Sequence, residues 1–161
     1  MSQSPFNKGA GNRLKRHKEV IKGLDGRKVE AGWFESARYK AGKGVSANQV
    51  GMSIAQIARI NEFGTATIPA RPFMRLAAIN FNRDRNDIQA KIGKKVIDGV
   101  ITPEQALGQI GLAMEAKIVD SIKNGNWPPN AESTAKAKGF KKNTPLIDTG
   151  QMFQNVTSKV S

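Results

Sequence analysis

Apolar and polar positions alternate in an early segment of the chain. In Lys28–Phe34, Val29, Ala31 and Trp33 fall on one face and polar or small residues on the other. This two-residue period predicts a β-strand. Residues 36–51, rich in glycine, lysine and serine, follow and indicate a loop.

A second strand is predicted at the carboxyl end, over Met152–Val160, with Met152, Val156 and Val160 on one side. Two strands alone are marginally stable in water. We therefore expect helices to cover the sheet. Alternatively, additional strands within residues 18–24 or 36–50, or strands from neighbouring subunits, complete it. The last strand is expected to be an edge strand that seeks a partner.

Helical spacing dominates the middle of the chain. Ser53 is expected to cap a first helix, with Gln56 completing a capping box. Gly64 is expected to end this helix in the left-handed conformation. A long helix is predicted from Phe73, and the polar patch at residues 82–87 is expected to bend or interrupt it. Its apolar positions are Leu76, Ala77, Phe81, Ile88, Ile92 and Val96.

A third helix begins at a clear sequence signal. Thr102-Pro103-Glu104-Gln105 marks this start, with Pro103 at the first helical position. The apolar stripe predicts that this helix runs to about Asn124. Its members are Leu107, Ile110, Gly111, Met114, Ile118 and Ile122. A short helix is predicted over residues 131–138.

These elements predict an α+β fold with two or three long helices packed against a small antiparallel sheet. With 161 residues, of which 39% are hydrophobic, a single domain is expected over residues 18–161. Residues 1–17 are polar and basic, and we expect a flexible amino-terminal segment there. No stretch has the apolar core of a signal peptide or the length of a membrane span, so a cytoplasmic protein without membrane contact is expected.

The net charge of +13 is concentrated near the amino end, where residues 1–43 hold 11 Lys or Arg against 4 Asp or Glu. A polyanion is a plausible partner, either DNA or an acidic protein surface; the alternative is a basic tail that aids solubility. No aromatic residue is interleaved with the cations from Arg13 to Lys28, so any DNA contact should be independent of sequence. The candidate contacts are Arg13, Lys15, Arg16, Lys18 and Lys22.

Candidate chemistry is sparse. The chain has no cysteine and one histidine, His17, so neither thiolate chemistry nor a histidine metal site is expected. Leu146–Gly150 carries the Asp-Thr-Gly signature of aspartic proteases, in which two such loops share one proton. One copy would require a dimer, and only 11 residues follow Gly150. We therefore favour a turn in which Asp148 and Thr149 bond the local backbone and Gly150 has a positive φ.

The connector between the first two helices contains charged and aromatic pairs. Glu62 and Arg71 are predicted to pair across it, either setting its shape or bridging subunits. Phe63 and Phe73 are expected to anchor the core on both sides; the alternative is that they fill a neighbour's pocket. Pro69 and Pro72 stiffen the connector, and Pro72 suits a helix's first turn.

The motifs together resemble a known family. Asn61-Glu62-Phe63-Gly64-Thr65 with Ile68-Pro69-Ala70-Arg71-Pro72-Phe73 is similar to the core motif of tailed-bacteriophage neck and tail-completion proteins of the HK97 neck type. Later segments follow the same order. These are Asn124-Gly125, Pro128-Pro129-Asn130, Ser133-Thr134, Lys138-Gly139 and Pro145-Leu146-Ile147-Asp148-Thr149-Gly150-Gln151-Met152. The resemblance covers about Val29 to Val160 and does not include the basic amino-terminal segment.

The resemblance implies a structural virion protein and no enzyme, cofactor or metal. Such proteins form rings at the head–tail junction, between head-side connector proteins and the tail tube or its terminator, with DNA passing through. They assemble in the host cytoplasm. The resemblance also implies an α+β fold with long helices on a small sheet. The alternative from the residues alone is a sequence-independent DNA-binding protein, which should bind free duplex tightly and lose affinity steeply with salt.

Overall fold

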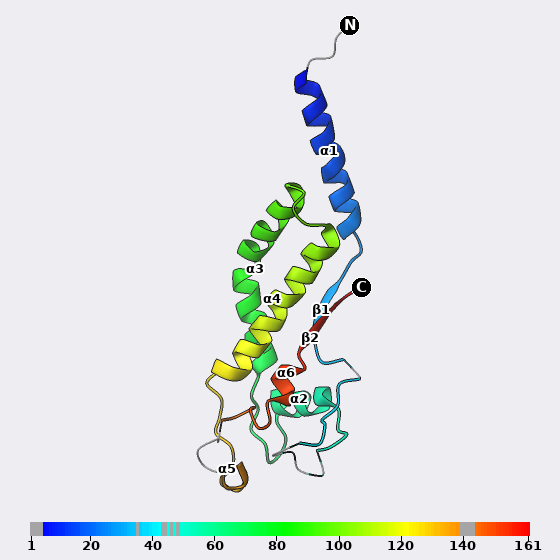
Figure 1. Ribbon diagram of the computed structural model, residues 1–161. Coiled ribbons are helices and arrows are strands. Elements are labelled where there is room, and N and C mark those ends of the chain that lie inside the picture. Colours follow the sequence, from blue (N-terminus) through cyan, green and yellow to red (C-terminus); the bar gives the residue numbers. More distant parts are fainter. Residues whose placement is uncertain (1–4, 35, 43–44, 46, 48, 139–143) are drawn as a thin grey trace.

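Two long antiparallel helices and a small sheet form the body of the protein (Figure 1). The structure is a computed structural model that describes residues 5–34, 36–42, 45, 47, 49–138 and 144–161. Its elements are α1 (Pro5–Leu24), β1 (Val29–Gly32), α2 (Ile54–Phe63), α3 (Phe73–Ile97), α4 (Pro103–Asn124), α5 (Glu132–Lys138), α6 (Gln151–Gln154) and β2 (Thr157–Val160). The described chain is mostly helical with a two-stranded antiparallel sheet, which is compatible with the predicted α+β class.

The sheet joins the two ends of the domain and lies on α4. Strand β1 pairs antiparallel with β2, in the register Val29 to Val160 and Gly32 to Thr157. A methyl group at Gly111 of α4 would collide with the side chain of Ser158. The helix and strand backbones therefore approach each other closely because this position has no side chain.

Two clusters of buried apolar residues hold the helices together. The first lies at the end where α2, α6 and the beginning of α3 meet, and contains Ile54, Ala58, Phe73, Ala77, Ile118, Ile122 and Met152. The second lies near the α3–α4 turn and contains Ile92, Val96 and Ala106, with Val20 of α1 packed against it. Helix α1 is therefore attached by its carboxyl-terminal half, and it projects past the α3–α4 turn (Figure 1).

Several predicted elements are confirmed. The first strand, the helices beginning after Ser53, at Phe73 and after Thr102, and the short helix α5 are all present. The Thr102 hydroxyl accepts the Gln105 backbone N–H, and the Gln105 side chain accepts the Thr102 N–H, so a capping box forms. Gly64 ends α2 with a positive φ of 73°, but its ψ of −179° lies outside the predicted left-handed helical region.

The amino-terminal prediction needs correction. The segment 1–17, predicted to be flexible, is helical from Pro5 onward, and the predicted domain start at residue 18 falls within α1. Gly9, Gly11 and Asn12 conceal the helix in the sequence because they are poor helix formers. The strand considered over residues 18–24 is also wrong, since this stretch completes the same helix.

Three local predictions are also wrong. Ser53 precedes α2, but its side chain makes no capping bond; its backbone instead bridges to Arg38. The polar patch in α3 does not break the helix, and Lys117 of α4 bonds Asp84 at 2.5 Å there. The final strand is shorter than predicted, because Met152 lies in α6 and is buried in the first cluster.

Candidate interaction site at the α2–α3 elbow

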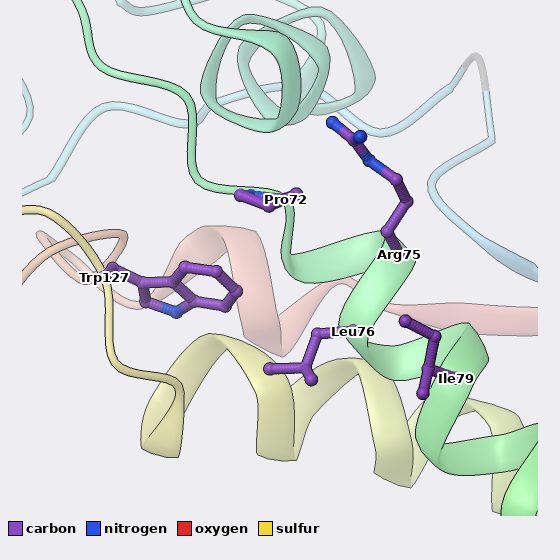
Figure 2. Close-up of a pocket in the computed structure, with 5 residues that line it drawn as sticks. All are labelled: Pro72, Arg75, Leu76, Ile79 and Trp127. Atoms are coloured by element: carbon purple, nitrogen blue, oxygen red, sulfur yellow. The ribbon is translucent and has the colours of Figure 1, made fainter.

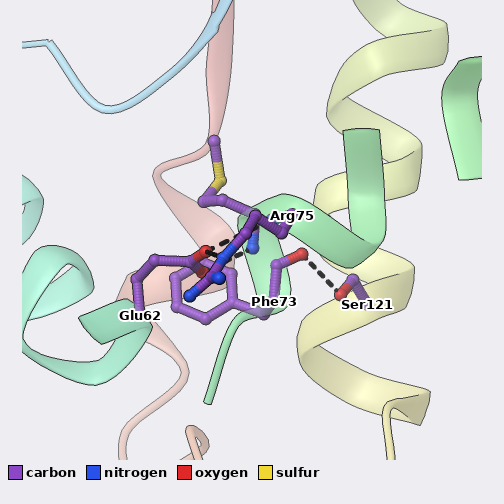
Figure 3. Close-up of polar contacts among 5 residues, drawn as sticks. Glu62, Phe73, Arg75 and Ser121 are labelled. Carbon is purple, nitrogen blue, oxygen red and sulfur yellow. Dashed lines mark hydrogen bonds and ion pairs between the residues drawn. The ribbon is translucent and has the colours of Figure 1, made fainter. Parts of the chain in front are cut away.

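The segment 61–75, which we call the elbow, joins α2 to α3 through a buried carboxylate. Glu62 is 5% exposed and lies in the last turn of α2. Its Oε2 accepts the Met74 N–H at 2.8 Å, and its Oε1 accepts the backbone N–H of Arg75 at 3.3 Å and the Arg75 Nε–H at 3.2 Å (Figure 3). Glu62 therefore caps a helix to which it does not belong.

The position of the Glu62 carboxylate is explained by its interaction with the first turn of α3. A negative charge in the last turn of α2 is unfavourable for that helix, whereas the first turn of α3 favours one. The N-cap residue of α3 is Pro72, which provides no side-chain cap. Glu62 supplies the missing acceptor and so fixes the angle between the two helices.

The predicted Glu62–Arg71 pair is wrong. Arg71 is 4% exposed and turns away from Glu62 toward the segment after α4. Its Nε donates to the Pro128 carbonyl at 3.0 Å and its Nη2 to the Pro129 carbonyl at 3.0 Å. Further bonds join Nη1 to Asn61 Oδ1 and Nη2 to Asn130 Oδ1, both at 3.3 Å. Burial lowers the pKa of the guanidinium, and these four acceptors offset its desolvation.

Phe73 anchors the start of α3, as the sequence predicts. Its side chain is fully buried, and its ring meets Trp33 edge-on at 5.9 Å between centroids. The Phe73 carbonyl accepts the buried Ser121 hydroxyl of α4 at 2.7 Å (Figure 3). The elbow is therefore tied to α2, to α4 and to the segment after α4.

Phe63 does not anchor the core. Its side chain is 66% exposed, with the Arg75 guanidinium 6.0 Å from the ring centroid. The preceding Glu62 points inward to reach α3, and this turns the next position toward solvent. The alternative, that Phe63 contacts a neighbouring subunit, remains a prediction.

An open hollow of about 350 Å³ lies beside the elbow (Figure 2). It is mainly apolar and is lined by Pro72, Arg75, Leu76, Ile79 and Trp127. The indole comes from the segment after α4, and its Nε1 donates to the Ser121 carbonyl at 3.0 Å. Ile79 is largely exposed at the rim. The hollow and Phe63 make this side of the elbow a candidate contact surface.

The Asp148–Gly150 segment forms a turn before α6. Gly150 has φ 80°, as predicted. The Thr149 hydroxyl is buried without a hydrogen-bond partner among the described residues, so the predicted bond from this side chain is not formed. The pKa of Tyr39 is raised by burial, and the Asp148 charge raises it further. The Gln151 side chain bonds both the N–H and the carbonyl of Lys40, a contact that sequence reasoning missed.

The structure places the basic candidates far from the elbow. Lys15, Arg16, Lys18 and Lys22 lie on α1 and are exposed. Arg13 also belongs to α1. The sequence therefore points to two separate surfaces, the elbow and α1.

Among the residues that the structure describes, no group of three or more His, Cys, Asp or Glu side chains could hold a metal ion, and no helix is long and apolar enough to span a membrane. Comparison with protein-family models, curated proteins and solved structures gives no match for this chain. The elbow can fix geometry and present an apolar contact surface.

Proposed function

We propose that this chain is a structural subunit of the bacteriophage neck, a tail-completion protein. Copies form a ring at the head–tail junction that joins the head connector to the tail tube around the DNA path. The proposal rests on the order of the sequence motifs and on how the elbow uses them. It places the protein in the virion, after assembly in the host cytoplasm.

The proposal rests mainly on one observation: both buried charged side chains of the elbow, Glu62 and Arg71, are hydrogen-bonded to backbone groups of the same chain. Glu62 binds the first N–H groups of α3, and Arg71 binds two carbonyls after α4. Both side chains are thereby engaged in fixing the subunit's shape. A ring closes only when each copy meets the next at one repeated angle, so such a subunit needs a rigid elbow.

The apolar side of the elbow supplies a surface for that contact. Phe63 and Ile79 are exposed; Ile79 lines the hollow, and Arg75, which also lines it, lies 6.0 Å from the Phe63 ring centroid. Exposed aromatic side chains next to a hollow are typical of subunit interfaces. In the proposed ring this surface packs against a different surface of the adjacent copy, as a heterologous interface requires.

Negative-stain microscopy of lysates tests the proposal, using an infection in which this gene carries a stop codon. A joining role predicts filled heads lying apart from finished tails. Tails of irregular length would instead indicate that the protein terminates the tail tube. Normal infectious particles would exclude the neck assignment and favour the DNA-binding alternative.

Complementation refines the test. A plasmid copy of the wild-type gene should restore joined particles, and so should Asp87→Ala, which changes an exposed residue of α3. Phe63→Ser should fail to restore them although the protein accumulates to normal levels. Restoration by Phe63→Ser would show that this side of the elbow is not a subunit interface.

A further inference from the structure

Helix α1 carries a stripe of cations that the rest of the fold leaves unneutralised. Lys15 and Lys22 are seven residues apart and Lys18 lies between them, so all three fall on one side of the helix. Lys15, Lys18 and Lys22 are exposed. None of these three forms an ion pair with a described carboxylate.

The helix is held firmly at one end only. Val20 packs against the cluster that contains Ile92 and Val96, and Gly23 lies against Pro103 at the beginning of α4. The amino-terminal part extends beyond the α3–α4 turn (Figure 1). The basic stripe is thus carried on a helical arm, attached to the body and open to a partner.

A second group of cations lies at the same end of the molecule. Lys91, Lys94 and Lys95 are exposed near the end of α3, beside the positions that receive α1. Of these, Lys94 pairs with Asp98 at 2.6 Å. The same end carries Glu19 on α1 and Asp98 after α3, so the six lysines of the two groups outnumber these carboxylates and favour a negatively charged partner.

We propose that α1 and the last turns of α3 form the surface that faces duplex DNA. This surface lines the channel of the ring, a placement that rests on the proposed function. The lysine stripe contacts phosphates, and no base is read. Binding is therefore independent of sequence and weak enough for the duplex to move through.

The charge of the chain favours DNA over other partners. At +13, copies repel one another through α1, so this helix is poorly suited to bind its own copy. A membrane surface would require a broad apolar face on the helix. The exposed large apolar side chains among the described ones of α1 are Leu14, Ile21 and Leu24, and Val20 is packed on the body. These side chains are too few to form such a face.

The test measures binding of the intact protein to a fluorescein-labelled random-sequence duplex of 30 base pairs, by anisotropy at several salt concentrations. If the three lysines of the stripe contact phosphates, the logarithm of the association constant should fall with the logarithm of the salt concentration with a slope at least as steep as about −2.7. The triple variant Lys15→Gln/Lys18→Gln/Lys22→Gln should bind more weakly and reduce the magnitude of that slope by about 2.7.

A matched control removes the same number of charges elsewhere. Arg59→Gln/Arg85→Gln/Lys136→Gln changes three exposed cations on α2, α3 and α5 and should keep the wild-type slope. Equal weakening by both variants would overturn the proposal, since only net charge would then matter. Absence of duplex binding, equal competition by polyglutamate, or binding of anionic vesicles in preference to duplex would also overturn it.

These measurements separate the inference from the proposed function. Duplex binding is measured on the isolated chain, and particle assembly is measured in lysates. Normal particles from the stop-codon infection would exclude the proposed ring, while the inference that α1 binds DNA would still stand. If heads and tails are separated but the chain does not bind duplex DNA, the proposed ring is supported and the inference that α1 lines its channel is excluded.

Discussion

Replacing Glu62 by alanine tests whether the elbow depends on a cap supplied by another helix. The change leaves the N–H groups of Met74 and Arg75 without their acceptor. Loss of a helix cap costs about 1–2 kcal/mol. Loss of a negative charge at a helix amino terminus costs a further 0.3–1 kcal/mol or so. The ion pair with Arg75 adds at most about 1 kcal/mol, because the arginine is mostly solvent-exposed.

We therefore expect Glu62→Ala to lower the free energy of unfolding by about 2–3 kcal/mol. For a chain of this length the melting temperature should fall by roughly 4–12 °C. Urea and thermal unfolding followed by circular dichroism would measure both quantities. Asp87→Ala, a control that removes an exposed carboxylate from α3, should stay within about 0.5 kcal/mol of the wild type.

A double-mutant cycle with Arg75→Ala identifies the partner that matters. If the backbone of α3 is the main partner, the coupling energy between the two side chains should be below about 1 kcal/mol, much less than the effect of Glu62→Ala alone. A coupling energy equal to the whole effect would refute the capping argument. A loss smaller than about 0.5 kcal/mol for Glu62→Ala would refute it as well.

Three further changes test other parts of the reasoning. Phe63→Ser should leave the free energy of unfolding within about 0.5 kcal/mol of the wild type and reduce self-association in sedimentation velocity; unchanged association would exclude this side of the elbow as an interface. Arg71→Lys should lower the free energy of unfolding by about 2–4 kcal/mol, because lysine cannot reproduce the planar fork, and a neutral result in urea unfolding would contradict this. Burial, and to a smaller extent the charge of Asp148, raises the folded-state pKa of Tyr39 above 10.0. The stabilisation that the protonated phenol gives to the folded state is therefore present below pH 10.0 and is lost as the pH rises through the folded-state pKa. Tyr39→Phe should therefore reduce the alkaline loss of stability seen in urea unfolding between about pH 9 and 11, and identical pH profiles would show that Tyr39 contributes nothing.

The sequence was most informative where local rules apply. The start of α4 at Pro103 and the positive φ at Gly64 depend on residues within a few positions, and both are present. The second strand was overextended for the opposite reason. Met152 is apolar and correctly spaced, but its partners are residues of α2 and α4 distant in the sequence, and it is buried from a helical turn.

The elbow shows what a sequence can and cannot specify. Glu62 and Arg71 were identified as charged residues that need partners, and both are buried. Their partners were wrongly assigned because backbone groups carry no residue-specific signal. One clue was available: α3 begins with Phe73, Met74 and Arg75 after a proline, so its first turn lacks both a capping side chain and an acid. Such a helix requires an acceptor from elsewhere, and Glu62 is the nearest carboxylate before it in the sequence.

The charges of this protein divide into two populations that salt should distinguish. Those of Glu62 and Arg71 are buried and hydrogen-bonded to backbone groups, so added salt screens them little. The lysines of α1 are exposed and unpaired with described carboxylates, so their contacts with a polyanion weaken steeply as salt rises. Moderate salt should therefore release the chain from duplex DNA while leaving the elbow folded. A subunit that holds a fixed angle to its neighbours and lets DNA slide past requires this separation of rigid and yielding contacts.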